Sequence, residues 1–332
     1  MRRCLIILPY FGKFPLYFPL FLKSVEKNPG YNWLIVTDDT RPFAWPENVT
    51  VCYQGFAALR ERIQSFFDFP ITLPEPYKLC DFRPAYGMIF AEELREYEYW
   101  GYGDCDLLFG NLERLLTPLL EKGYDKVFAA GHLTLYRNTP ENNARFLKDY
   151  EGKPLYRRAF TDPGTCCFDE DYLEENIHRI FLADGARVYA KDRSLNLAMG
   201  YSQFRLIPYV EAEGGFRLQP FRRGLYVWDD GELSVIREGK DGTLAAHPYL
   251  YIHFQSRDMR WREGLERESR IWIYPNGFKR LAGYPATLRQ WKRMTRYSFT
   301  TYYFRQKWRG WKRKSAEFKK ALRQSREGKK TQ

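Results

Sequence analysis

The stretch "RCLIILPYFGKFPLYFPLFLKSVEKNPGYNWLIVTDD", residues 3–39, decides the fold. Its first part, RCLIILP (3–9), is a short continuous apolar run, typical of a strand buried on both faces of a parallel sheet. A segment with apolar residues at helical spacing follows, and Asn-Pro-Gly at 28–30 ends it. NWLIVTDD (32–39) and NVTVCY (48–53) predict two more strands. This strand–helix–strand–strand order predicts an α/β fold with a nucleotide-sized crevice at the carboxyl ends of the strands.

The composition sets limits on the class of protein. The chain has 332 residues, of which 44% are hydrophobic, 28% charged and 18% aromatic, so it can bury a large core. No apolar run is long enough for a transmembrane helix. The first apolar run is short and lacks a small-residue cleavage site, so we interpret it as a buried strand rather than a signal peptide. Without an export signal, the six cysteines are expected as reduced thiols, and their spacing fits no zinc pattern.

The net charge of +12 is unevenly distributed. Residues 286–332 contain 16 Lys/Arg against 2 Asp/Glu, together with 9 aromatic residues, whereas the rest of the chain is almost neutral. We therefore expect a folded domain over 1–285, with a donor-nucleotide half over about 1–140 and an acceptor half over about 141–285. A basic, aromatic, helical tail would follow. Such a tail suits an anionic membrane surface. A solvated tail is the simpler alternative, and nucleic-acid binding is disfavoured because no base-reading module accompanies it.

An acidic corner stands out in GYGDCDLLFG, residues 101–110. Asp104 and Asp106 lie where a strand ends, and at such a corner two carboxylates can converge. Hard divalent cations prefer oxygen ligands and leave positions open for phosphate oxygens. Spacing alone is a weak signal, because a solvated turn also holds D-x-D by chance. The sequence contains no G-x-G-x-x-G after its first strand and no P-loop motif, so neither of those nucleotide sites is expected.

The order of elements and the position of this corner resemble glycosyltransferases of the GT-A fold, a Rossmann-like mixed sheet flanked by helices, with a DxD motif. The resemblance is closer to bacterial proteins of cell-surface polysaccharide gene clusters, of the capsule or O-antigen type. It rests on ILPYFGKFPLYFPLFLKS, YKLCDFRPAYG, GYGDCDLLFGNL, GHLTLYRN and YIHFQ, which span residues 3–255 and match best over the first 140. The basic tail is outside the resemblance.

The resemblance implies roles for several residues. Asp104 and Asp106 would bind Mn²⁺ or Mg²⁺ and the diphosphate of a nucleotide-sugar, and His253 in YIHFQ would complete the metal shell, although a histidine on an apolar strand is usually a core residue. His132 in GHLTLYRN would face the cleft and contact the donor sugar or acceptor. In the loop after the first strand, Tyr10 or Phe11 would stack on the base; capping the core is the alternative.

Five further charged residues are candidates because of the sequence around them. Thr-Asp-Asp ends the second strand, where Asp38 and Asp39 would hydrogen-bond the base or ribose, unless they form a plain turn. In YKLCDFRPAYG, the residues Lys78, Asp81 and Arg83 interleave with apolar ones just before Pro84. A buried loop does not carry such charges unpaired. We expect them to shape the donor pocket, the alternative being an internal salt-bridge network.

An inverting transfer also needs a carboxylate that accepts the proton of the acceptor hydroxyl, whereas a retaining transfer needs no such base, and the sequence leaves both open. TDPGTCCFDEDYLEE (161–175) supplies Asp169 and Glu170 as candidates, although an acidic helix start explains the same residues.

The sequence thus predicts a metal-dependent glycosyltransferase at the inner face of the plasma membrane, in the cytoplasm. It would transfer a sugar from a UDP-sugar to a surface polysaccharide or a polyprenyl-linked glycan. A non-catalytic membrane-associated assembly factor, a nucleic-acid-binding protein and a nucleotidyltransferase remain as alternatives.

Overall fold

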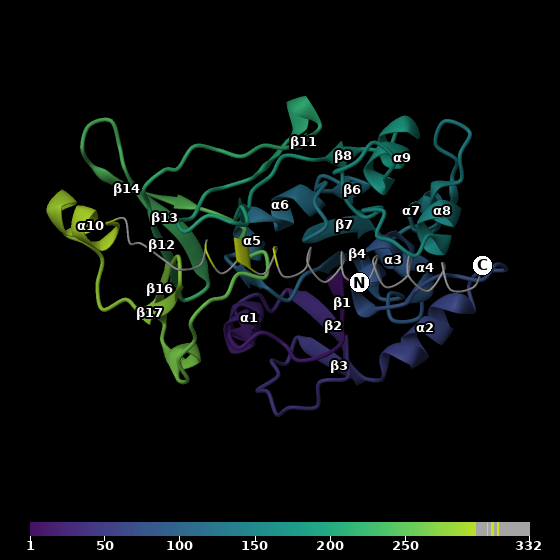
Figure 1. Cartoon of the computed structure of the whole chain (residues 1–332), viewed down its shortest axis with the longest axis horizontal. Helices are drawn as coiled ribbons and strands as arrows, with labels where there is room; N and C mark the ends of the chain where they lie inside the picture. The colour runs from purple at the N-terminus through teal and green to yellow at the C-terminus, as the bar shows by residue number, and fades with distance from the viewer. Residues whose placement is uncertain (297–303, 305–306, 309–310, 312–332) are drawn as a thin grey trace, which may run out of the picture.

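The structure is a computed structural model of the chain and describes residues 1–296, 304, 307–308 and 311. A seven-stranded sheet in the order β3-β2-β1-β4-β7-β6-β8 forms its centre (Figure 1). The first four of these strands are parallel, and β7 is antiparallel to both β4 and β6. The mixed α/β sheet expected from the sequence is therefore confirmed. The strand bounds are β1 (Arg2–Tyr10), β2 (Tyr31–Thr37), β3 (Val49–Tyr53), β4 (Tyr97–Gly103), β6 (Lys126–Val127), β7 (Leu133–Arg137) and β8 (Val188–Tyr189).

Alternating residues of β1 pack on the two faces of this sheet. Cys4 and Ile6 belong to a core with α1 (Phe18–Glu26), and Ile7 belongs to a second core with α2 (Phe56–Gln64). All three side chains are fully buried. A strand buried on both faces must be apolar at every position, which is the pattern that the sequence shows for residues 3–9.

The other helices are short. The helical segment after Pro84 ends at Ile89, and the one after Asn111 divides at Leu116, because Pro118 removes an amide donor from the following helix. The α-helices are α3 (Leu79–Phe82), α4 (Tyr86–Ile89), α5 (Leu112–Leu115), α6 (Thr117–Leu120), α7 (Pro140–Ala144), α8 (Leu155–Thr161), α9 (Ile177–Ala183) and α10 (Leu288–Met294). Single 3₁₀ turns are η1 (Pro76–Lys78), η2 (Arg83–Ala85), η3 (Arg145–Leu147), η4 (Glu211–Glu213) and η5 (Leu265–Arg267).

The described residues also form three smaller sheets, with the strand orders β5-β15-β9, β10-β11 and β14-β13-β12-β16-β17. The five-stranded sheet is antiparallel and lies to the left of the central sheet in Figure 1. Two of its strands form a hairpin, with Asp230 and Gly231 in the left-handed region at the turn. The strands are β5 (Leu107–Phe109), β9 (Leu195–Asn196), β10 (Tyr209–Val210), β11 (Gly215–Phe216), β12 (Leu225–Asp229), β13 (Glu232–Glu238), β14 (Leu244–Pro248), β15 (Tyr251–His253), β16 (Arg270–Tyr274) and β17 (Gly277–Arg280).

The beginning of the predicted tail packs against the five-stranded sheet. Trp291 of α10 is buried, and its indole nitrogen donates to the carbonyl oxygen of Ile236 at 3.0 Å. Apart from residues 304, 307–308 and 311, the predicted tail beyond Arg296 lies outside the described residues, so its membrane role stays a prediction. None of the helices among the described residues is both long enough and apolar enough to span a bilayer.

Candidate active site

A wide cleft lies where the order of the central sheet changes direction. The chain moves from β1 to β2 and β3 on one side and then returns to β4 on the other, and ligands of open α/β sheets bind outside the carboxyl ends of strands at such a point. The cleft has a volume of about 960 Å³. It is lined by the loop after β1, the Gly103–Asp106 corner after β4 and residues from His253 to Met259 after β15.

Asp104, Asp106 and His253 meet in this cleft. Their ligand atoms lie within 4.8 Å of one another, a grouping that could hold a metal ion. His253 Nε2 is 3.7 Å from Asp104 Oδ2 and 3.4 Å from Asp106 Oδ1. Burial lowers the pKa of His253, but Asp106 and Asp104 outweigh it, so the pKa is raised overall. The three residues come from the β4–β5 corner and from β15, which pairs with β5.

The remaining polar atoms of these three side chains are held by the protein. Asp104 Oδ1 accepts from Arg83 at 2.5 Å, and Asp106 Oδ2 accepts from the backbone N–H of Ser256 at 2.5 Å. His253 Nδ1 lies 3.0 Å from Asn196 Oδ1. Since this amide oxygen can only accept, Nδ1 carries a hydrogen, and Nε2 is the ring nitrogen that faces the carboxylates. One oxygen of each carboxylate and one ring nitrogen therefore converge, while their other polar atoms are anchored.

His132 lies beside this group. Its ring centroid is 4.5 Å from that of His253, its Nδ1 is 2.8 Å from the Tyr251 hydroxyl, and its buried Nε2 has no partner among the described residues. Burial, and then the His253 charge, lowers the pKa of His132, which keeps the ring neutral. A neutral imidazole in the cleft wall can form one hydrogen bond with a ligand through its Nε2 atom.

Arg83 connects the acidic corner with the opposite wall. Its guanidinium contacts Asp104 on one side and, at 2.9 Å each, Asp169 Oδ2 and the Gly131 carbonyl oxygen on the other. Glu170 Oε2 accepts from the Gly131 N–H at 3.1 Å. A Cβ atom at Gly131 would lie 2.8 Å from Asp169 Oδ2, so a residue with a side chain would displace this carboxylate. The predicted pair Asp169 and Glu170 is thus brought to the same cleft as Asp104.

Burial dominates the electrostatics of this pair of carboxyl groups. It raises the pKa of Asp169 to about 8, against the opposing effect of Arg83. Burial also raises the pKa of Glu170, and the hydrogen bond from Gly131 opposes it. A carboxyl group with a raised pKa in a cleft can exchange a proton near neutral pH.

Lys78 and Asp81 do not line the cleft, which corrects the expectation that they shape the donor pocket. Lys78 Nζ donates to Asp81 Oδ2 at 2.6 Å, to the Ala159 carbonyl oxygen at 2.8 Å and to that of Gly164. Asp81 also accepts from the backbone N–H groups of Cys166 and Phe168, at 2.8 and 2.9 Å. Both side chains are buried, so the internal network is the better interpretation. It fixes the loop that leads to Asp169.

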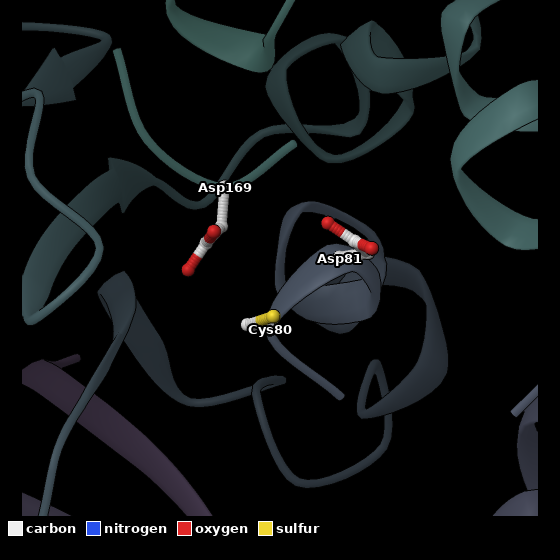
Figure 2. Close-up of side chains that lie close together, drawn as sticks. All are labelled: Cys80, Asp81 and Asp169. Atoms are coloured by element: carbon white, nitrogen blue, oxygen red, sulfur yellow. The ribbon is translucent and has the colours of Figure 1, made fainter. Parts of the chain in front are cut away.

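Cys80, Asp81 and Asp169 form a second group of ligand-type atoms (Figure 2). The carboxylate oxygens already accept hydrogen bonds within the protein. Asp81 accepts from Lys78 and from two backbone N–H groups, and Asp169 accepts from Arg83. Burial raises the pKa of the Cys80 thiol, which disfavours the thiolate that a metal requires. This group is therefore a poor metal site compared with Asp104, Asp106 and His253.

The base-binding candidates separate into two kinds. Tyr10 and Phe11 line the cleft, Tyr10 stacked on Phe14 and Phe11 edge-on to Phe56. Asp38 and Asp39 are used within the protein: Asp38 Oδ1 accepts from Gly12 N–H at 2.7 Å, and Asp39 pairs with Arg41. Arg41, by hydrogen bonding, lowers the pKa of Asp39. The two aspartates therefore hold the loop after β1 in place rather than lining the cleft.

Asn196, Tyr251 and Ser256 also belong to the site, although they were not predicted from the sequence. Asn196 lies on the two-residue strand β9, which pairs with β15. Ser256 and the preceding Gln255 both have φ of +52°, a strained conformation that brings the Ser256 N–H to Asp106. Tyr251 and Ser256 lie in or beside YIHFQ, whereas Asn196 has no sequence signal, because contacts between distant short strands leave no local pattern.

Comparison with known proteins gives a family for this chain. Residues 6–282 match the model of a family of unknown function, DUF6625. The chain belongs to this family. No curated protein matches. The family match begins within β1 and extends past β17, so it includes all of the residues that line the cleft.

Several solved structures are similar to this DUF6625 member. Mouse xyloside xylosyltransferase 1 in its apo form has 11% identity and a TM-score of 0.36, covering 59% of this chain and 87% of its own. The galactosyltransferase LgtC, in complex with donor and acceptor sugar analogues, has 10% identity and a TM-score of 0.31, covering 58% and 75%. The glycosyltransferase GlyE of Streptococcus pneumoniae TIGR4 has 10% identity and a TM-score of 0.26, covering 57% and 45%. Since these TM-scores are low, we base the function on the geometry of the site.

Proposed function

We propose that the protein is a glycosyltransferase that uses a divalent cation and a nucleotide-sugar donor. One observation carries this proposal: Asp104, Asp106 and His253 converge at the switch point of the sheet, each with its outer polar atom anchored by the protein. Several of the similar structures are glycosyltransferases, but the proposal rests on the site alone.

The donor set fits Mn²⁺ or Mg²⁺. Two carboxylate oxygens and one imidazole nitrogen suit a cation of this hardness, and the Asn196 contact turns Nε2 of His253 toward the site, where it would bind the cation after losing its proton. Thiols do not enter the group, which disfavours softer ions. When bound, the cation would neutralise the diphosphate of the donor.

Other side chains of the cleft would bind and orient the substrates. Arg83 stands between Asp104 and Asp169, where its guanidinium would attract the negative diphosphate. Tyr10 and Phe11, in the loop after β1, would support the base. His132 would offer its Nε2 to a sugar hydroxyl. These groups together would hold the anomeric carbon of the donor next to Glu170.

We propose that Glu170, rather than Asp169, accepts the proton of the acceptor hydroxyl. Asp169 is paired with Arg83 and positions it, whereas Glu170 makes a single backbone hydrogen bond to Gly131. In the transfer, the bond between the anomeric carbon and the diphosphate oxygen breaks, the acceptor oxygen bonds to that carbon, and its proton passes to the Glu170 carboxylate. The nucleoside diphosphate leaves with the bonding electrons.

The finer assignments follow the sequence. The donor would be a UDP-sugar, and the acceptor a surface polysaccharide or a polyprenyl-linked glycan. The basic segment after residue 285 would hold the protein on the inner face of the membrane, close to such an acceptor.

Calorimetric titration of UDP and GDP, with and without Mn²⁺, tests the proposal. We expect UDP to bind only with Mn²⁺, and Asp106→Asn to lose this binding, because it removes one ligand charge. Asp149→Asn, at an exposed carboxylate outside the cleft, is the matched control and should bind as the wild type does. Glu170→Gln should retain nucleotide binding while losing transfer. Failure of both nucleotides to bind would contradict the proposal and favour the assembly-factor alternative.

A further inference from the structure

A second cavity, of about 240 Å³, lies behind one wall of the main cleft. The wall is the segment from Phe204 to Ile207: Phe204 and Leu206 face the second cavity, whereas Ile207 lines the cleft. Backbone hydrogen bonds fix this segment to β9, among them Ile207 N–H to the Asn196 carbonyl oxygen at 2.8 Å. The second cavity is therefore a separate space with its own lining residues, on a firmly positioned part of the fold.

The cavity is cationic at one end. It contains Arg237 of β13 and Arg222 of the loop before β12, and none of the described residues that line it is an aspartate or glutamate. Arg237 donates to the Tyr249 hydroxyl at 3.0 Å, but its buried Nε has no hydrogen-bond partner within the described part of the chain. Neither arginine forms an ion pair with a described residue. A partly buried guanidinium with no counter-charge favours an anion.

Aromatic side chains form the other walls. Phe204 and Tyr226 meet edge to face, with ring centroids 4.9 Å apart, and Tyr249 lies beside Arg237. Burial raises the pKa of Tyr226 to about 12, so this phenol remains neutral and can donate a hydrogen bond. A small pocket with aromatic walls and a few fixed polar groups recognises a small ring-shaped molecule by its faces and its polar edge.

We infer that this cavity binds one acidic sugar unit, with its anionic group on Arg237 and Arg222 and its ring between the aromatic walls. Two kinds of ligand share this chemistry. Both are sugars with a single anionic group, which is a carboxylate in a uronic acid and a phosphate ester in a sugar phosphate. The cavity volume of about 240 Å³ is smaller than the roughly 300–1,000 Å³ of pockets for drug-sized ligands, which suits a ligand as small as one sugar unit. The inference is independent of the proposed transfer reaction, because it requires neither a metal nor a nucleotide.

Ligand-observed NMR titrations of the full-length protein in EDTA would test the inference, with glucuronate, glucose 6-phosphate, inorganic phosphate and glucose as probes. We expect glucuronate or glucose 6-phosphate to bind at least about tenfold more tightly than glucose, because charged hydrogen bonds to arginine are lost with the neutral sugar. Binding of glucuronate alone identifies the carboxylate source, and binding of glucose 6-phosphate alone identifies the phosphate source. Both results support the inference.

Variants locate the binding, because basic residues elsewhere also attract anions. Arg237→Gln should weaken acidic-sugar binding about tenfold, and Arg222→Gln, at an exposed position that does not threaten the fold, should weaken it several-fold. Arg223→Gln removes the same charge one residue further on, outside the cavity, and should have no effect. Equal losses in Arg222→Gln and Arg223→Gln, equal binding of glucose, or binding of inorganic phosphate as tight as that of the acidic sugars would each overturn the inference.

Discussion

Asn196 determines which nitrogen of His253 faces the acidic corner. Its amide oxygen accepts from both His253 Nδ1 and Gln255 Nε2, at 3.0 Å each. Residues that orient a metal-binding histidine in this way change metal affinity by roughly 10- to 100-fold when removed. We expect Asn196→Ala to weaken Mn²⁺ binding by about this factor, measured by electron paramagnetic resonance of free Mn²⁺ during a titration.

Asn196→Asp serves as the matched variant. It keeps an oxygen acceptor for Nδ1–H and should therefore retain the affinity for Mn²⁺, although it loses the donor to the Ile207 carbonyl oxygen. If Asn196→Ala and the wild type bind Mn²⁺ equally, His253 is not oriented for metal binding.

The short helix α3 owes its position to the buried Lys78–Asp81 pair. Lys78→Met would leave the buried Asp81 carboxylate without its cation, which typically costs about 3–5 kcal/mol of folding free energy. We expect a loss of this size in urea denaturation, together with unchanged UDP affinity per folded molecule. Arg95→Met, which removes the exposed partner of Glu92, is the control and should leave the stability unchanged. Selective loss of UDP affinity with normal stability would restore a donor-binding role for Lys78.

Strand β6 contains a buried lysine whose charge opposes folding. Lys126 is fully buried, donates to the Phe128 carbonyl oxygen and lies 3.2 Å from His178 Nδ1. Burial lowers the pKa of Lys126 from 10.5 to about 7, while Asp171 and Asp169 act in the opposite direction. Between these values the unfolded chain binds a proton that the folded one does not, so stability should rise with pH in this range.

The Lys126→Met variant lacks this titration. The stability of the wild type relative to Lys126→Met should therefore increase from pH 7 to pH 10 by at most about 1.4 kcal/mol per pH unit, and stay constant below pH 6. Denaturant titrations of both proteins across this range provide the measurement. Parallel stability curves would mean that Lys126 is not perturbed.

The whole molecule combines a nearly neutral folded body with a strongly basic C-terminal segment. Each cation near an anionic membrane contributes roughly 1 kcal/mol to binding. Replacing Lys312, Arg313, Lys314, Lys319 and Lys320 by glutamine in the full chain should thus reduce binding to phosphatidylserine vesicles at least about tenfold in a co-sedimentation assay. Phosphatidylcholine vesicles and duplex DNA are the controls. Loss of DNA binding with unchanged vesicle binding would favour the nucleic-acid alternative.

Sequence reasoning was most effective where the relevant contacts are local. The strands over 3–9 and 32–39 have continuous apolar runs because both of their faces are buried, and Asp104 and Asp106 belong to one corner. The resemblance also implied that His253 joins them, and the structure brings the three together. The strands and the acidic corner could be predicted because the residues that determine them lie within a few positions of one another in the sequence.

The remainder depends on contacts between distant segments. Asn196 reaches His253 through the pairing of a two-residue strand with a three-residue strand, too short for any periodic pattern. Lys78 and Asp81 have the composition of a ligand site, and only the backbone of residues 159–168 shows that their charges are used internally. Charged residues in an apolar loop therefore indicate that a partner exists, without indicating which one.

The origin of the three converging side chains also has a consequence for biosynthesis. Asp104 and Asp106 leave the ribosome long before His253, and β15 must insert between β5 and β9 before the imidazole can approach them. A nascent chain that ends before β15 contains the two carboxylates without the imidazole, and two carboxylates alone select little among divalent cations. If the proposed metal site is correct, selective binding of the ion follows synthesis of β15, after most of the central sheet has been translated.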